Sequence, residues 1–383
     1  MSTTRFDEMG VVSIERLKQV PIRYYVGVLF FGGLVILPLG LETLDILTMV
    51  GAFFFVMFVI SWDFVSGYTG MVSFGHTLYF ALGGYTTGIL NLTYGIDPTV
   101  GIIAGVLVAT LAGALIGIPA LRIEGHYLAL FTLLPPLILL RVFQLFREQT
   151  GGKQGLADPA NLIELGSITA TAYANYYLAF AVLLFVFLLA FLITRSDTGK
   201  IFTAIRESED AVSSAGINPN KFKLFAFTLS AALGGLAGAV FVHTPAGSPS
   251  PTQLLALVVQ IEILISAIFG GFGTITGAMA GGFFFYWVTN WLENLDWIVP
   301  VLNEPITQLD EVLFYLLMLG FLMYLREGAL PWATRMGRRI VSYAQVGDSQ
   351  TVADGGQTRL ARVLENCRER YMDAREFLER WDR

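Results

Sequence analysis

The sequence predicts an all-α polytopic membrane protein with about eight to ten transmembrane helices. Of its 383 residues, 55% are hydrophobic and only 14% are charged, and the mean hydropathy is +0.63. A water-soluble domain carries about 25% charged residues, so much of this chain faces lipid. The lone cysteine, Cys367, excludes a disulfide framework and a cysteine-based zinc site. Three isolated histidines argue against a metal site or a Ser/His/Asp hydrolase.

Ten apolar segments are candidate spans, because a bilayer core of about 30 Å needs about 20 mostly apolar residues per helix. They are 24–40, 43–62, 72–92, 99–120, 126–146, 174–194, 222–243, 253–271, 274–292 and 311–326. The first and second segments are joined by almost no residues, and so are the eighth and ninth. A re-entrant helix in either pair would lower the number of spans, so the expected count is eight to ten.

The basic residues predict the orientation of the chain. If all ten segments cross, all but three of the 24 lysines and arginines fall on one side, which the positive-inside rule identifies as the cytosol. The exceptions are Arg141, Arg147 and Lys153. We therefore expect a cytosolic N-terminal segment 1–23 without a cleaved signal peptide, a transmembrane domain 24–326, and a cytosolic tail 327–383. Both termini would then be cytoplasmic in a chain that we expect to lie in a prokaryotic plasma membrane.

Glycine spacing predicts close helix packing, because small residues four positions apart allow helices to approach in lipid. The glycines expected at such contacts are Gly84, Gly88, Gly234, Gly238, Gly273, Gly277 and Gly281. Glycine-rich stretches precede the third and ninth spans and Pro135 and Pro136 interrupt the fifth, so discontinuous helices are expected at all three places. The stretches 67–75 and 270–277 are also loosely alike, as matching elements of two halves would be.

The longest polar interruption on the expected cytosolic side is the loop 195–223, which has the features of a short amphipathic helix. Asp197 or Thr198 is placed to cap its start, and Gly216 is placed to end it. Ile201, Ala204, Ile205 and Ala211 are expected to supply its apolar face. Such a helix at the end of a bundle is suited to dock into the groove of a partner, although a solvated connector would show the same pattern.

The sequence of residues 196–239, SDTGKIFTAIRESEDAVSSAGINPNKFKLFAFTLSAALGGLAGA, resembles the LivM-type permeases of branched-chain amino-acid ABC importers. Three more segments fit that family in the same order: 67–88 (GYTGMVSFGHTLYFALGGYTTG), 122–133 (RIEGHYLALFTL) and 268–277 (IFGGFGTITG). The family's coupling pattern reads here as Asp210-Ala211-Val212 followed by Gly216, with aspartate where glutamate is usual and valine in place of an alanine. The resemblance covers roughly residues 45–325.

This resemblance implies a type II ABC-importer-like permease bundle that takes up branched-chain or related amino acids. It implies a LivH-like second permease, two LivG/LivF-like ATPases and an extracytoplasmic binding protein as partners. The chain has no Gly-x4-Gly-Lys-Ser/Thr phosphate loop, so it is not expected to be an enzyme, and ATP and Mg²⁺ would be used by its partners. The residues expected to couple it to the ATPases are Arg206, Glu207, Asp210, Ala211 and Gly216.

The substrate path is predicted from polar residues in or beside the spans, because such residues are costly in lipid and are often functional. The candidates are Tyr68, Ser73, His76, Thr77, Gln260 and Glu262. No metal or nucleic-acid site is expected. Permeases for urea or short-chain amides share the same framework, and a stand-alone ion-coupled secondary transporter is a further alternative.

Two features lie outside the resemblance. Residues 357–382 place their apolar side chains on one face of a predicted amphipathic helix within the tail. Five lysines against nineteen arginines and an acidic stretch at 293–311 favour a high-salt habitat.

Overall fold

The computed structural model describes residues 22–123, 125–157, 159–247 and 249–293, with short stretches at 298–299, 304–305, 315–316, 319–320, 323, 328–332 and 335–336. The chain divides into two compact units, Met1–Gly328 and Ala329–Arg383. The elements discussed below belong to the first unit, and the described residues of the second are helical. Most of the expected N-terminal segment and tenth span, and the expected amphipathic helix 357–382, lie outside the described residues.

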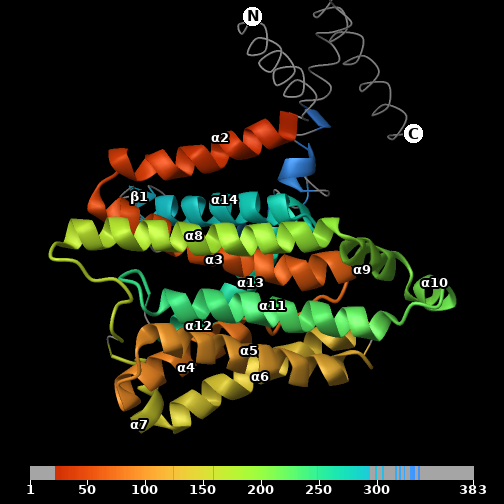
Figure 1. The fold of residues 1–383 in the computed structure, drawn as a ribbon, viewed down its shortest axis with the longest axis horizontal. Coiled ribbons are helices and arrows are strands. Elements are labelled where there is room, and N and C mark those ends of the chain that lie inside the picture. The colour runs from red at the N-terminus through yellow and green to blue at the C-terminus, as the bar shows by residue number, and fades with distance from the viewer. Residues whose placement is uncertain are drawn as a thin grey trace, which may run out of the picture. The chain divides into compact units, whose positions relative to one another are not determined.

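The predicted all-α class is confirmed, since helices form nearly all of the described first unit (Figure 1). The elements before the long polar loop are α2 (Ile22–Ile36), the 3-10 helix η1 (Leu37–Gly40), α3 (Thr43–Thr69), α4 (His76–Tyr94), α5 (Pro98–Ala120), α6 (His126–Leu145), α7 (Arg147–Thr150) and α8 (Ile168–Arg195). The later helices are α9 (Asp197–Glu207), α10 (Glu209–Ser214), α11 (Pro219–Phe241), α12 (Pro251–Leu254), α13 (Leu257–Gly271) and α14 (Ile275–Glu293). The two-residue strands β1 (Ile298–Val299) and β2 (Glu304–Pro305) pair antiparallel.

Five helices in the described residues are long and apolar enough to cross a membrane: α3, α5, α6 from Tyr127, α8 and α11. Two shorter apolar stretches are Val26–Gly40 and Leu257–Gly271. They belong to the first and eighth predicted segments, each a member of a closely joined pair for which a re-entrant helix was considered. A 15-residue helix such as α13 is about 22 Å long, which is shorter than a bilayer core of about 30 Å. The chain is therefore a multi-pass membrane protein.

Helix α3 forms the centre of the unit. Most of its residues are buried, on every side of the helix, as expected for a helix that neighbours surround. It contacts α8, α11, α13 and α14, and it lies between α8 and α11 in Figure 1. Aromatic rings fill the contacts, with the Phe53 and Tyr176 ring centroids 5.0 Å apart and those of Phe58 and Phe80 4.6 Å apart. The helix runs to Thr69, seven residues beyond the predicted span, because polar side chains such as Asp63 and Ser66 are buried within it.

Helices α4, α5 and α11 meet through backbone rather than through side chains. A Cβ at Gly83 would lie 2.1 Å from the Gly235 carbonyl oxygen, and one at Gly238 would lie 2.0 Å from that of Phe80. Helices α13 and α14 meet in the same way, because a Cβ at Gly281 would lie 2.0 Å from the Ser266 carbonyl oxygen. Of the glycines named from the sequence, Gly84 also abuts α11, and Gly277 abuts the carbonyl of Gly270.

The chain breaks its helices before α4 and before α14, as predicted. Residues 70–75 are non-helical between α3 and α4, and Phe272, Gly273 and Thr274 separate α13 from α14. Gly70 and Gly273 take positive φ angles of 76° and 73°, which glycine adopts without strain.

The break predicted at Pro135 and Pro136 is wrong, because α6 is continuous from His126 to Leu145. A proline has no N–H and so frees the carbonyl four residues earlier, which for Pro136 is that of Thr132. This carbonyl lies against Gly75, where a Cβ would be only 2.1 Å from the oxygen. The Thr132 hydroxyl also accepts the Phe74 N–H at 3.0 Å. A neighbouring segment thus packs against the proline site, and the helix need not break there.

The end of α2 is held by tyrosines of α8. The last carbonyls of a helix have no partner within it, and in lipid no water is available to replace one. Tyr176 donates to the Leu34 carbonyl at 2.6 Å, and Tyr177 donates to that of Val35 at 3.2 Å. Tyr173 donates to the carbonyl of Pro38 in η1 at 2.9 Å.

We expect Gly238→Ala to lower the thermal midpoint of the full-length chain in detergent, because its methyl group would collide with the Phe80 carbonyl. Overpacking of this kind costs about 1–3 kcal/mol. The control is Gly32→Ala on α2, where no atom lies within 4 Å of the added Cβ. Equal midpoints for the two variants would contradict the backbone contact.

Candidate functional site: a buried polar cluster and the α9–α10 unit

The start of α4 is capped by a side chain from another helix. The N-cap residue Gly75 has no side chain to satisfy the first N–H groups of α4. Gln260 of α13 replaces it, since its Oε1 accepts the N–H of His76 at 2.8 Å and that of Thr77 at 3.1 Å. All three side chains are buried. The break before α4 is thereby tied to α13.

The His76 ring is surrounded by two serines and two aromatic rings. Its Nε2 lies 2.9 Å from the Ser61 hydroxyl and 3.3 Å from the Ser230 hydroxyl. Both hydroxyls already donate to carbonyls, Ser61 to Phe58 and Ser230 to Ser61, each at 2.8 Å. A hydroxyl that has donated its hydrogen can only accept, so this arrangement fits the tautomer in which Nε2 carries the hydrogen.

Two polar groups of this cluster have no hydrogen-bond partner in the part of the chain that the structure describes. These are His76 Nδ1, which is an acceptor in this tautomer, and Gln260 Nε2, which is a donor. Buried polar groups are nearly always hydrogen-bonded. The cluster therefore has one unused acceptor and one unused donor at the start of a broken helix.

The structure brings together four of the six residues predicted for the substrate path. Gln260 joins His76 and Thr77. Ser73 lies in the segment just before α4, where its hydroxyl accepts the N–H of the N-cap residue Gly75 at 3.2 Å and its carbonyl accepts Trp62 Nε1–H at 2.7 Å. Glu262 is two residues from Gln260 on α13, so it points to a different side of that helix.

Tyr68 lies near the end of α3 instead, where its hydroxyl accepts the Ile275 N–H at 3.3 Å. Sequence reasoning missed Ser61 and Ser230, because single serines in apolar helices are common and carry no distinctive spacing.

The loop 195–223 forms two helices, α9 and α10, which we call the α9–α10 unit. Its start is capped differently from the prediction, since the N-cap residue is Ser196 rather than Asp197 or Thr198. Asp197 pairs with Lys200 at 2.8 Å on an exposed surface, and this hydrogen bond lowers the pKa of its carboxyl group. The Ser208 hydroxyl caps α10 by accepting the Ala211 N–H at 3.3 Å. Gly216 follows the end of α10 with a φ of 81°, so the predicted stop is confirmed.

The inward face of the unit differs from the predicted one. The buried side chains are Phe202, Ile205 and Val212, whereas Ala204 and Ala211 are exposed. Phe202 packs edge-on against Phe64 of α3, with ring centroids 5.7 Å apart. The larger residues thus point inward because they bury more apolar area than alanine does.

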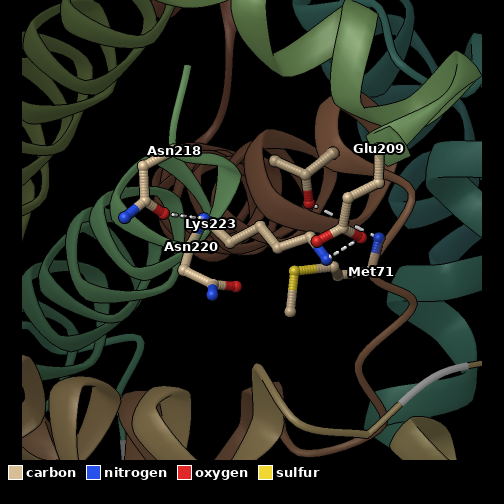
Figure 2. A network of polar contacts seen from close by, with 6 residues as sticks. Met71, Glu209, Asn218, Asn220 and Lys223 are labelled. Carbon is tan, nitrogen blue, oxygen red and sulfur yellow. Dashed lines mark hydrogen bonds and ion pairs between the residues drawn. The ribbon is translucent and has the colours of Figure 1, made fainter. Parts of the chain in front are cut away.

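Two charged residues fasten the unit to the helix bundle. Glu209 forms an ion pair with Lys223 of α11, whose side chain is only 10% exposed, and Figure 2 shows this pair beside Met71. Arg206 Nη1 donates to the Gly67 carbonyl oxygen at the end of α3 at 2.7 Å. The five residues predicted to contact an ATPase are all exposed: Arg206, Glu207, Asp210, Ala211 and Gly216. Of these, Arg206 also bonds to the bundle through its guanidinium.

The two glycine-rich stretches that are loosely alike in sequence touch each other beside Arg206. The Gly273 N–H donates to Asp63 Oδ1 at 2.8 Å, and a Cβ at Gly67 would lie 2.6 Å from the Gly273 nitrogen. Asp63 is fully buried, and no described residue bonds to its other carboxyl oxygen. The breaks before α4 and α14 therefore share a junction with the α9–α10 unit.

Comparison with known proteins identifies related sequences. The permease protein LivM of the high-affinity branched-chain amino acid transport system of Escherichia coli K12 is 30% identical over 255 residues, which are 61% of this chain and 59% of that protein. The probable LivM of Methanocaldococcus jannaschii is 23% identical over 76% of this chain and 94% of its own length. The autoinducer 2 import permease LsrC of Yersinia pseudotuberculosis is 26% identical over 71% of this chain and 75% of its own length.

The match therefore spans less than two thirds of the E. coli relative. No solved structure matches. The family model described as the permease component of branched-chain amino acid transport systems matches residues 44–322, which include α3 to α11, the α9–α10 unit and both helix breaks. This chain belongs to that family of transport permeases.

Proposed function

We propose that this chain is a transmembrane permease subunit of an ABC importer for branched-chain or related amino acids. The observation that carries the proposal is the α9–α10 unit, which is fastened to the bundle by Phe202, Arg206 and Glu209 and exposes a polar face. A helix pair held in this way can transmit the movement of a soluble partner to the helix bundle. Family membership supports the same function, because the family consists of transport permeases.

The partners follow from that function. They are a LivH-like second permease, two LivG/LivF-like ATPases that use ATP and Mg²⁺, and an extracytoplasmic binding protein. The α9–α10 unit and both termini face the cytosol in this proposal, consistent with the side on which the basic residues gather. Glu207, Asp210, Ala211 and Gly216 form the surface offered to the ATPases, because they are exposed on or just after the two helices.

The substrate path is assigned to the polar cluster at the start of α4. Ser73, His76, Thr77 and Gln260 are the only predicted path residues that the described part of the chain brings together. The unused acceptor on His76 and the unused donor on Gln260 complement the ammonium and carboxylate groups of an amino acid. Opening of the break before α4 during the transport cycle would expose these groups to the substrate.

We expect the transporter complex, purified through a tag on this chain and reconstituted in proteoliposomes, to take up labelled leucine only when ATP is present on the side of the ATPases. Uptake should persist when ion gradients are abolished. Leucine uptake driven by an ion gradient without ATP would instead identify a secondary transporter. Competition by unlabelled isoleucine, valine, urea, short amides and autoinducer 2 would identify the substrate class.

We expect Asp210→Arg to reduce both the amount of ATPase that copurifies with the chain and ATP-dependent uptake, because it reverses a charge on the proposed docking surface. The matched control is Asp197→Arg, a reversal at the exposed start of α9. Membrane insertion should be normal in both variants. An equal loss in the two, or a loss in neither, would show that the docking surface lies elsewhere.

We expect Gln260→Met to lower the thermal midpoint and the initial rate of uptake, because it removes the acceptor of two N–H groups at the start of α4. Loss of an N-cap acceptor costs about 0.5–2 kcal/mol. The control is Glu262→Gln, which changes a neighbouring side chain on another side of α13. A normal uptake rate per folded Gln260→Met molecule would remove the cluster from the substrate path.

A further inference from the structure

Arg206 of α9 bonds to the C-terminal end of α3. The last four carbonyls of a helix lack intrahelical partners, and a cation near them is also favoured by the helix dipole. The guanidinium satisfies the Gly67 carbonyl at 2.7 Å, and the Arg206 side chain crosses Gly70, where a Cβ would lie 3.1 Å from its Cγ. The coupling helix α9 thus reaches the beginning of the break before α4.

The same nitrogen of Arg206 also reaches the break before α14. A Cβ on Gly273 would lie 2.4 Å from Arg206 Nη1, so only glycine leaves room for the guanidinium there. Gly273 is in turn bonded to Asp63 through its N–H. The Arg206 side chain therefore adjoins both the break before α4 and the break before α14.

Asp63 supplies an unused acceptor at this junction. It lies one turn before Gly67 on α3, it is fully buried, and its Oδ2 has no hydrogen-bond partner among the described residues. A buried carboxyl oxygen without a partner is costly. The Arg206 guanidinium lies against Gly67 and Gly273, the same two glycines that the Asp63 carboxyl group contacts. In the present arrangement the guanidinium bonds to the carbonyl and its Nη2 lies 3.7 Å from Glu207 Oε1, and it makes no ion pair with Asp63.

We propose that Arg206 is a positioning residue that exchanges hydrogen-bond partners during the transport cycle, between the Gly67 carbonyl and the free oxygen of Asp63. This inference rests on the proposed function, because displacement of α9 by the ATPases drives the exchange. Interactions at the Gly67 carbonyl hold the end of α3 to α9. When the guanidinium bonds to Asp63 instead, the same displacement of α9 moves the start of α14, because Asp63 accepts the Gly273 N–H. Arg206 thereby converts movement of α9 into movement at both helix breaks.

Arg206 is suited to this transmission rather than to surface docking. Its side chain is 31% exposed, against 74% for the neighbouring Glu207. A planar guanidinium presents several N–H donors at fixed angles, so it can begin to bond one acceptor before it leaves the other. Lysine has the same charge but lacks this geometry.

The test uses the complete transporter purified through a tag on this chain, with the ATPases that copurify, in proteoliposomes. The variants are Arg206→Gln, Asp63→Asn, the double variant, and Lys200→Gln as a control at the opposite end of α9. Asp63→Asn keeps an oxygen to accept the Gly273 N–H, so the fold is retained. Leucine uptake, ATP hydrolysis and ATPase content are measured on each preparation.

We expect ATPase content and ATP hydrolysis to remain near those of the unchanged protein, while leucine transported per ATP falls at least about 5-fold in each single variant, the low end of typical coupling between sites. The double variant should be no worse than the more severe single variant, because both changes remove one interaction. Lys200→Gln should behave like the unchanged protein.

Three results would overturn the inference: an unchanged transport-to-ATP ratio, a multiplicative loss in the double variant, or loss of ATPase from the Arg206→Gln complex, which would make Arg206 a docking contact. Failure of the proposed function is distinguishable from all three, because the unchanged complex would then show no ATP-dependent uptake.

Discussion

Backbone hydrogen bonding at helix breaks is the constraint on which this structure depends. Inside a bilayer an unpaired N–H or C=O group has no water to bond, yet the chain interrupts its helices after α2, before α4 and before α14. At each interruption a side chain from a distant helix supplies the missing partner. Gln260 serves α4, Tyr176 serves α2, and Asp63 serves the segment before α14. The breaks are therefore also the places where helices distant in sequence are joined.

The bundle has two kinds of helix contact: close approach of backbones, and hydrogen bonds between polar groups. Helices α4, α5 and α11 touch through glycines such as Gly83 and Gly235, which leave no room for a side chain or for sliding. The junction around Asp63, Gly273 and Arg206 is instead held by a few hydrogen bonds. Packed glycine faces resist change, whereas hydrogen bonds can be exchanged one at a time. Movement during transport is thus expected at the polar junction, with the glycine-packed helices moving as a block.

Sequence reasoning recovered what depends on local composition and missed what depends on distant partners. Apolar length predicted the helices, and glycine predicted the breaks before α4 and α14 and the stop at Gly216. The prolines in α6 were misjudged, because the sequence does not show that Gly75 of another segment packs against the Thr132 carbonyl. The bond between Arg206 and the Gly67 carbonyl was not predicted, since the sequence does not show that this carbonyl lies within reach of the guanidinium. Polar residues such as Asp63 ended the predicted span early, although the fold buries them inside α3.

The tyrosines of α8 also have a consequence for how the protein is made. Tyr176 and Tyr177 each bond a carbonyl of α2 that lies 142 residues earlier in the chain. When α2 leaves the ribosome, these tyrosines have not been synthesised. The last carbonyls of α2 therefore lack these hydrogen-bond partners until α8 is inserted. The contacts of α2 are therefore complete only after Tyr177 has been translated, and a truncation that stops before α8 would leave the last carbonyls of α2 without these partners.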